Sequence, residues 1–341
     1  MVKELAIRKD ELANETIETI YFGGGTPSLL SKEEIETLLD AVHQNYKVIE
    51  NTEITLEANP DDLSEEKILE LANSPINRLS IGVQSFFEED LKSMNRAHNA
   101  KEAKECLSMA TRHFDNITVD LIYGVPNMSN ERWKENLQIA FGFGVNHISS
   151  YALTVEPKTV LDSFVKNGKY PAPDETVAKE HFDILVVETA KNGLIHYEIS
   201  NFGKADYFSK HNTSYWLGKK YIGIGPSAHS FSKTHRSWNI ANNAKYIKEL
   251  QQGNLPNEVE ELSKEDQFNE YLMTGLRTIW GVSLNEIDED FKEQLLISSK
   301  KFIDEDLLEI SVTSSGVETL KTTPKGKFLA DGLASELFII K

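Results

Sequence analysis

Cysteine is the residue that this sequence most conspicuously lacks, with Cys106 the only one in 341 residues. A single thiol excludes an internal disulfide, and it excludes a zinc or iron–sulfur site built from this chain's cysteines. Cys106 lies between Ala103, Leu107 and Ala110 at helical spacing. We therefore expect a buried apolar residue there, and we assign neither a catalytic residue nor a metal ligand within the chain.

Long apolar runs and positive charge are also scarce. No stretch approaches the roughly 20 apolar residues of a membrane-spanning helix, and residues 1–18 lack the apolar core of a secretory signal. We therefore expect a cytoplasmic protein. The net charge of −18 disfavours nucleic acid and anionic membranes as partners. The acid is concentrated in residues 255–310, where fifteen Asp and Glu face five Lys and Arg.

The first half alternates short apolar strands with amphipathic helices. Strands are predicted at 17–22, 53–56, 78–83, 117–122 and 147–151, and helices at 31–44, after Ser64, and at 88–94, 100–113 and 131–143. This alternation predicts an α/β fold of parallel βαβ units, open or closed as a barrel. Residues 2–13 are helix-like and no strand precedes them, so we expect a partial barrel that lacks its first strand.

The second half is less regular. A helix is predicted at 178–192 and a sixth strand at 196–200, followed by a Gly-, Ser-, His- and aromatic-rich stretch at 201–238 that is typical of functional loops. Helices at 241–252, 264–279, 289–304 and 324–337, with strands at 308–312 and 317–322, indicate a winged-helix-like α+β domain. We thus predict a partial barrel over 1–205, a His- and aromatic-rich connection over 206–252 and a C-terminal domain over 253–341.

Polar residues gather where the predicted parallel strands end. The run from Gly23 to Pro27 follows the first strand, and no Gly-Lys-Ser/Thr follows it, which excludes a Walker phosphate loop. The carboxyl ends of parallel strands converge on one ligand-binding edge. There the glycine amides would join Glu57, Gln84 and Asp120 and hold an amino acid and a ribose. Each side chain, taken singly, is also compatible with an ordinary cap or loop residue.

Several of these runs occur together in one known family. GGGTP (23–27), EANPD (57–61), IGVQSF (81–86), NRAH (95–98) and DLIYGVP (120–126) resemble the core of the radical-SAM group that contains oxygen-independent coproporphyrinogen III oxidase and the HemW-type heme chaperones. HNTSYW (211–216) and GIGPSAHSF (223–231) resemble the C-terminal half of that group, closer to the chaperones. The resemblance implies a radical-SAM barrel with S-adenosylmethionine (SAM) contacts from Gly24, Gly25, Thr26, Glu57, Gln84, Arg96 and Asp120.

One departure from the family bears on activity. The family binds a [4Fe–4S] cluster through a C-x-x-x-C-x-x-C motif, and this sequence contains no such motif. We expect an N-terminally truncated member, in preference to a natural cluster-free paralogue. The cluster would then belong to the full-length form, and the polypeptide as it stands should not cleave SAM.

Four of the nine histidines fall between positions 196 and 235, among aromatic and basic residues. Imidazole and phenolate ligate heme iron, and aromatic rings stack on a flat macrocycle. We therefore take His211, Tyr215 and His229 as candidate heme contacts, near Lys219, Lys220, Arg236, Trp216 and Trp238. The alternative is a loop whose histidines bond to the backbone.

Three functions follow from these features. The first is a heme chaperone that binds heme or porphyrin and delivers it to an acceptor protein, with a homodimer implied by the resemblance. The second is an oxygen-independent coproporphyrinogen III oxidase, which needs the cluster as its electron source. The third is an RNA-modifying radical-SAM protein that uses the Lys219, Lys220 and Arg236 patch, against which the acidic charge counts.

Overall fold

Parallel strands organise the first half of the chain, as the alternation predicts. In the computed structural model, which describes residues 1–13, 15–312 and 316–340, a seven-stranded sheet has the order β1-β2-β3-β4-β5-β7-β6. Neighbouring strands from β2 to β5 pair in parallel. These strands are β1 (Ile17–Phe22), β2 (Val48–Ala58), β3 (Arg78–Gln84), β4 (Ile117–Tyr123) and β5 (His147–Ala152). The predicted α/β class and partial barrel are confirmed.

The predicted sixth strand is present but ends early. β6 (Ile195–Glu198) turns directly into β7 (Asn201–Gly203), which pairs antiparallel with both β6 and β5. The carboxylate of Glu198 accepts hydrogen bonds from the Ser200 amide at 3.1 Å and from the Asn201 side chain at 2.6 Å. These local bonds reverse the chain where the sequence pattern predicts a continuous strand.

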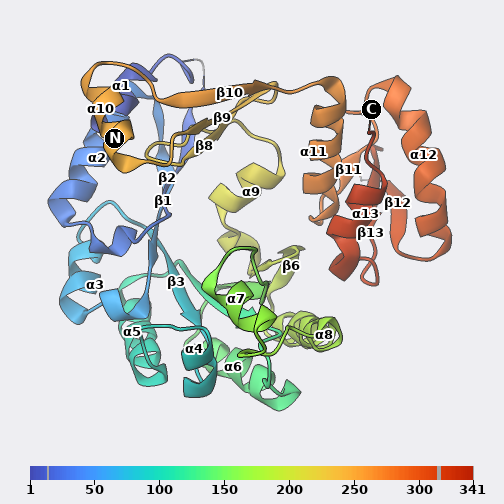
Figure 1. The fold of residues 1–341 in the computed structure, drawn as a ribbon, viewed down its shortest axis with the longest axis horizontal. Helices are drawn as coiled ribbons and strands as arrows, with labels where there is room; N and C mark the ends of the chain where they lie inside the picture. Colours follow the sequence, from blue (N-terminus) through green and yellow to red (C-terminus); the bar gives the residue numbers. More distant parts are fainter. Residues whose placement is uncertain (14, 313–315, 341) are drawn as a thin grey trace. The chain divides into compact units, whose positions relative to one another are not determined.

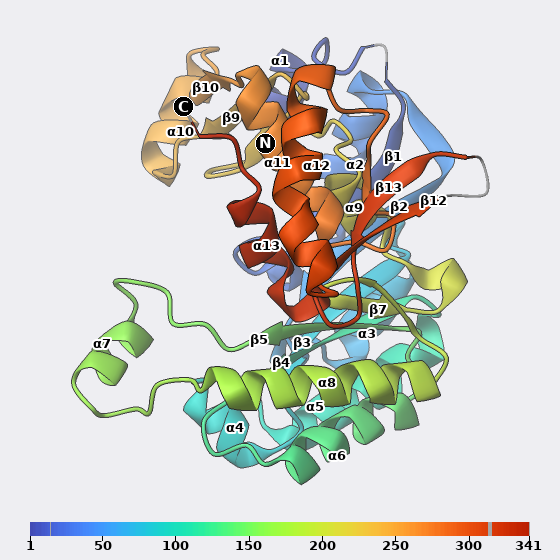
Figure 2. The same cartoon turned by 90° about the vertical axis from the view of Figure 1, so that its right-hand side faces the viewer.

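Helices cover one face of this sheet. They are α3 (Glu65–Ala72), α4 (Glu88–Ser93), α5 (Ala100–His113), α6 (Asn130–Gly142) and α8 (Glu175–Lys191), while α2 (Lys32–Asn45) follows β1 in the chain. Trp133 of α6 is fully buried, stacks on His181 of α8 and lies 5.8 Å from Tyr123 of β4, ring to ring. Figure 2 shows α5, α6 and α8 along the same side of β3 to β5. Cys106 on α5 is buried, as predicted.

Contacts along the chain gather into two units, each described here by itself. One comprises residues 19–32 and 53–209, and the other residues 1–18, 33–52 and 210–341. Short 3₁₀ turns occur at η1 (Pro27–Leu29), η2 (Pro60–Asp62), η3 (Ala205–Tyr207) and η4 (Lys327–Leu329). Helix α7 (Val160–Lys166) buries none of its residues and stands on an extended loop in Figure 2. Among the described residues, no helix has both the length and the apolar character to cross a bilayer.

The second unit contains a small sheet that the sequence pattern does not reveal. Helix α9 (Lys210–Trp216), strands β8 (His229–Phe231), β9 (His235–Asn239) and β10 (Asn257–Glu261), and helix α10 (Asn243–Gln251) occupy the stretch predicted as loops and the segment after it. The strands are antiparallel in the order β10-β9-β8. Strands of three to five residues with Gly and Ser around them are too short to show a clear period-2 pattern.

Helix α1 (Val2–Ile7) is shorter than the predicted 2–13 and is anchored by buried charge. The Glu4 carboxylate is fully buried and accepts hydrogen bonds from the Gly225 amide, the Asn239 amide group and the Tyr246 hydroxyl. Arg8 ends the helix and donates to Glu4 at 3.3 Å and to the Gly223 carbonyl at 2.8 Å. Figure 1 shows α1 beside α10 accordingly.

The C-terminal region has the predicted winged-helix-like α+β arrangement. Helices α11 (Lys264–Leu276) and α12 (Glu289–Asp304) precede a hairpin of β12 (Leu308–Val312) and β13 (Glu318–Thr322), and β11 (Val282–Ser283) completes a sheet ordered β11-β13-β12. Helix α13 (Ala330–Glu336) closes it. Its core includes Phe268, Leu272, Leu276, Leu295, Leu320 and Leu333.

The buried Glu4 predicts a large loss of stability on truncation. Glu4→Ala leaves Arg8 with one fewer partner in a buried site and orphans three donors, so the free energy of unfolding should fall by about 3–5 kcal/mol. Glu11→Ala is the matched control, because Glu11 also pairs with Arg8 but its side chain is 43% exposed. Urea denaturation followed by circular dichroism measures both. Equal losses in the two variants would contradict this account of α1.

Candidate functional site

The two faces of the half-barrel sheet differ sharply in polarity. The register of the paired strands places apolar side chains such as Leu56, Leu79 and Ile117 on the face covered by helices. The alternate residues form the inner face, and nearly all of them are polar. From β2 to β5 the inner face carries Glu53, Thr55, Glu57, Arg78, Ser80, Thr118, Asp120, His147, Ser149 and Tyr151. The inner face is therefore the polar face of the sheet.

Glu57 lies at the centre of the predicted edge. Its Oε1 accepts a hydrogen bond from the Tyr21 hydroxyl at 2.6 Å, and its Oε2 accepts one from the Gly24 amide at 3.1 Å. A Cβ at Gly23 would lie 2.5 Å from the Tyr21 ring and 3.1 Å from the Glu57 carboxyl carbon. Gly23 therefore makes room for this contact, which ties the glycine loop to β2.

The glycine loop beyond that contact is open. Gly24 and Gly25 adopt φ values of +72° and +67°, and no atom lies within 4 Å of a Cβ built on either. Thr26 follows as an exposed residue ahead of η1. Left-handed backbone without side chains leaves amides accessible to a ligand. The residues present thus fit the amino-acid end of SAM.

The structure brings Gln84 and Arg96 together at the end of β3. A Cβ on Gly82 would lie 2.9 Å from the Gln84 amide nitrogen and 3.5 Å from the Arg96 guanidinium. Arg96 donates to the Asn59 side chain at 2.8 Å and lies 3.4 Å from the Gly82 carbonyl. Arg96 is therefore held against the sheet edge, with Gln84 in a left-handed conformation at φ +67° beside it.

Asp120 lies deeper on the inner face. Both of its oxygens are 3.3 Å from the Ser80 hydroxyl. Withdrawal from water and the negative charge of Glu57 raise the pKa of Asp120 to about 7, although Arg78 and the hydroxyls of Ser80 and Ser149 oppose that rise. The carboxyl thus titrates near neutrality, and a cationic ligand would favour its ionised form.

Sequence reasoning missed Tyr21 and the buried residues beneath this edge. Burial and the Glu57 charge raise the pKa of Tyr21, which therefore stays a hydrogen-bond donor. Its signal was available, because Tyr21 lies two residues before Gly23 on the same strand face. Arg78 offered no such signal, because its contacts are Glu53 on β2 and Thr118 on β4, which only strand pairing brings near it.

The predicted heme residues lie on α9 and on the small sheet of the second unit. His229 of β8 is opposite Trp238 of β9, with their rings 6.3 Å apart. Phe231 is opposite Arg236 on the same face and bridges to Tyr221. The aromatic series continues from Tyr221 to Tyr215 at 4.4 Å and from Tyr215 to His211 at 4.9 Å.

We call this second set the His–aromatic face; it comprises His211, Tyr215, Tyr221, His229, Phe231 and Trp238. His229 and Tyr215 are exposed, whereas His211 and Trp238 are partly buried. The three cations near the heme candidates are each paired with a carboxylate at 2.6–2.7 Å: Lys219 with Glu18, Lys220 with Glu15 and Arg236 with Glu270. His196 lies elsewhere, since it stacks on Phe202 at 4.1 Å in the first unit.

An iron–sulfur cluster does not fit the residues present. Burial raises the pKa of the Cys106 thiol to about 12, which keeps it protonated inside α5. The described part of the chain also holds no group of three or more His, Cys, Asp or Glu placed as metal ligands. We therefore derive no chemistry through a cluster held by this chain.

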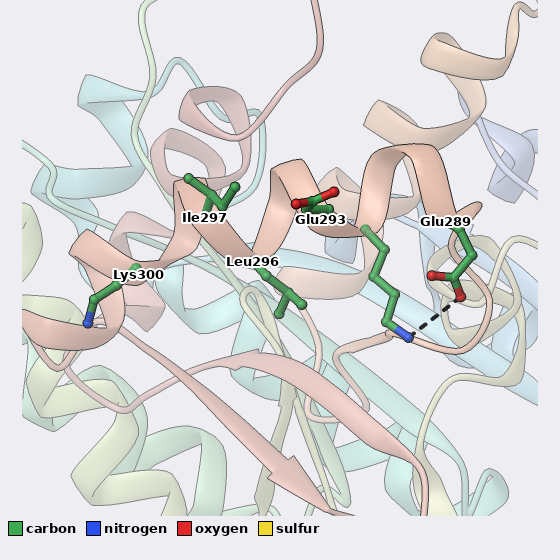
Figure 3. Close-up of a pocket in the computed structure, with 6 residues that line it drawn as sticks. Glu289, Glu293, Leu296, Ile297 and Lys300 are labelled. Carbon is green, nitrogen blue, oxygen red and sulfur yellow. Dashed lines mark ion pairs between the residues drawn. The ribbon is translucent and has the colours of Figure 1, made fainter.

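A further recess is lined by residues of helix α12. Figure 3 shows its lining along one side of that helix, where Lys292 lies 4.0 Å from Glu289. All of the lining residues come from this single helix, and none is a predicted site residue. They are Glu289, Lys292, Glu293, Leu296, Ile297 and Lys300.

Comparison with solved structures supports the barrel assignment. The structure of coproporphyrinogen III oxidase (HemN) from Escherichia coli superposes with a TM-score of 0.82 over 99% of this chain and 81% of that one. The sequence identity is 20%, so this likeness shows the shared fold alone.

Sequence comparison identifies the family. The Radical SAM superfamily profile matches residues 2–140. The heme chaperone HemW of Bacillus subtilis is 33% identical over 320 residues, covering 92% of this chain and 84% of the relative. HemW of Lactococcus lactis is 35% identical over 329 residues, covering 94% and 86%. With this extent of identity, the chain belongs to the HemW family of radical-SAM proteins.

Proposed function

We propose that this protein is a heme chaperone that binds heme on the His–aromatic face and passes it to an acceptor protein. The observation that carries the proposal is the convergence of two sequence runs far apart in the chain. HNTSYW supplies His211 and Tyr215, GIGPSAHSF supplies His229, and ring contacts through Tyr221 and Phe231 join the two runs.

The exposure of this face suits delivery. Imidazole and phenol side chains can ligate iron, and flanking aromatic rings can stack on a porphyrin plane. A chaperone must release its ligand, so a face with exposed His229 and Tyr215 suits the task better than a closed cavity would. The ion-paired state of Arg236 and the two lysines makes iron ligation and stacking the main source of affinity in this proposal.

SAM belongs to the proposal as the ligand of the strand-end residues. Glu57 with Tyr21 would receive its amino group, the amides at Gly24 to Thr26 its carboxylate, and Asp120 its ribose or the positive charge of its sulfonium. Gln84 and Arg96 would border it at the end of β3. In family members that carry a cluster, the cluster supplies the electron that cleaves SAM, and this chain's own residues bind and orient the molecule.

The proposal also covers the location of the protein, its oligomeric state, its partners and its domains. We propose a cytoplasmic location, a homodimeric full-length form, and heme or porphyrin with an acceptor protein as partners. We also keep the division into a barrel over 1–205, a His- and aromatic-rich connection over 206–252 and a C-terminal domain over 253–341 as a functional division of labour.

The heme proposal predicts a specific absorption band. Hemin added to the purified chain should give a shifted Soret band that saturates at one equivalent. His211→Ala and His229→Ala should each weaken hemin binding about tenfold, because each removes an iron ligand candidate worth more than about 1.4 kcal/mol. His43→Ala is the control, since His43 is an exposed histidine on α2 outside this face.

Two outcomes would count against the heme proposal. One is the absence of a saturable band, and the other is equal loss in all three variants, which would indicate nonspecific hemin adsorption. Turnover of coproporphyrinogen without stable heme binding, by a form reconstituted with a cluster, would favour the oxidase in place of the chaperone.

The SAM proposal predicts that Tyr21 contributes through Glu57. Tyr21→Phe removes one hydrogen bond to a carboxylate and should weaken SAM binding roughly three- to tenfold, whereas Glu57→Gln should weaken it more. Calorimetric titration measures both variants. Glu66→Gln on the exposed side of α3 is the control. Unchanged affinity in Glu57→Gln would place SAM elsewhere.

A further inference from the structure

A buried row of polar side chains crosses the inner face below the ligand edge. The Arg78 guanidinium donates to the Thr118 hydroxyl, whose oxygen lies 3.0 Å from Nδ1 of His147. The other ring nitrogen of His147 lies 2.7 Å from the Tyr197 hydroxyl. The Tyr197 oxygen also accepts the Ser209 amide at 3.2 Å. These residues come from β3, β4, β5 and β6, so the row ties four strands together.

Arg78 is the sole guanidinium on the described inner face of β2 to β5, and it is 2% exposed. Its Nε lies 3.9 Å from Glu53, which is too far for a hydrogen bond, and has no other partner. The hydroxyl of Thr55, its neighbour in register, is likewise buried and unpartnered. Arg78 is therefore fixed in place by Thr118 and is not neutralised by close contact with a single acid.

Three carboxyls share this face with one guanidinium. Glu53 precedes Thr55, the register partner of Arg78, by two residues and lies 3.9 Å from the Arg78 Nε, whereas Glu57 and Asp120 lie nearer the ligand edge. His147 adds no charge, because burial and the Arg78 charge hold its pKa well below the usual value. The same positive charge opposes the rise in the pKa of Asp120 and also acts on Tyr21 and Tyr197. Arg78 is thus the positive centre of the whole inner face.

We propose that Arg78 is a positioning residue for the strand-end site: its buried guanidinium, held by Thr118 on the same face as Asp120, sets the charge of Asp120 and so fixes the pH range in which this carboxyl receives a sulfonium ligand. This inference rests on the proposed SAM site. It assigns a role to a residue that does not touch the ligand.

The pH dependence follows from the groups that face Asp120. Burial and Glu57 favour its protonated form, while Arg78 favours its ionised form. Because the protonated carboxyl offers no charge to a sulfonium, SAM affinity should fall about tenfold per pH unit below the titration midpoint. The charged and titratable groups that act on Asp120 or that it acts on are Tyr21 on β1, Glu57 on β2, Arg78 on β3 and Tyr151 on β5.

A pH titration by infrared spectroscopy tests this role without SAM. The C=O stretch of a protonated carboxylic acid reports Asp120, and its loss in Asp120→Asn assigns the band. The parent midpoint should lie near the Asp120 pKa of about 7. Arg78→Met should raise the midpoint by about one pH unit or more, Glu53→Gln should lower it, and Arg78→Lys should keep it close to that of the parent.

Opposite shifts from the loss of a cation and the loss of an acid separate electrostatics from general damage to the fold. If Arg78→Met fails to fold by circular dichroism, Thr118→Val replaces it, because that variant keeps the charge but loosens its anchor and should raise the midpoint by a smaller amount. Midpoints that stay within about 0.3 pH unit of the parent in folded Arg78→Met or Thr118→Val and in Glu53→Gln would overturn the inference.

SAM titrations on the same variants separate this inference from the site it rests on. At pH 7, Arg78→Met should bind SAM about fivefold more weakly than the parent, and the loss should disappear above the raised midpoint. S-adenosylhomocysteine, which lacks the sulfonium charge, should show little of this dependence. If the midpoints move but SAM affinity does not change with them, the SAM site and the positioning role are refuted. The effect of Arg78 on the charge of Asp120 would still be supported.

Discussion

The separation of polar and apolar residues across one sheet is the constraint on which the rest of this structure depends. Along the parallel strands β2 to β5, apolar residues that pack against helices mostly alternate with polar residues that face inward. The apolar side supplies the stability, since burial of residues such as Leu79 and Ile81 is complete. The polar side gains little from burial, so its charges must be satisfied by one another or by a ligand.

The polar groups of the inner face have hydrogen-bond partners to different degrees along the strands. At the amino ends, Arg78, Thr118, His147 and Tyr197 bond to one another and form a closed row. At the carboxyl ends, Glu57 is bonded to Tyr21 and the Gly24 amide, and Asp120 has only long contacts with Ser80 and a pKa raised to about 7. Structural and ligand-binding polar groups therefore occupy successive levels of the same strands, which explains how a site rich in buried acid remains part of a stable fold.

Much of this could be predicted because it depends on local pattern. Strand ends locate Glu57 and Asp120, glycine in a row predicts an open loop, and α5 and α12 have the bounds that their apolar spacing indicates. Arg78 escaped prediction because its role depends on register between strands that are far apart in sequence. The β8–β10 sheet escaped because its strands are very short, and the orientation of Arg96 toward Asn59 depends on a contact 37 residues away.

The reversal of the chain after β6 shapes the ligand edge as well as the sheet. Because β7 runs antiparallel to β5, the turn around Ser200 lies at the same edge as the carboxyl end of β5, and the Ser200 carbonyl accepts the Ser150 amide at 2.7 Å. The edge is therefore asymmetric. Backbone without side chains at Gly24 and Gly25 borders one side, and the hydrogen-bonded turn at Ser200 borders the other. One border of the edge thus exposes main-chain amides, and on the other the main chain is already paired.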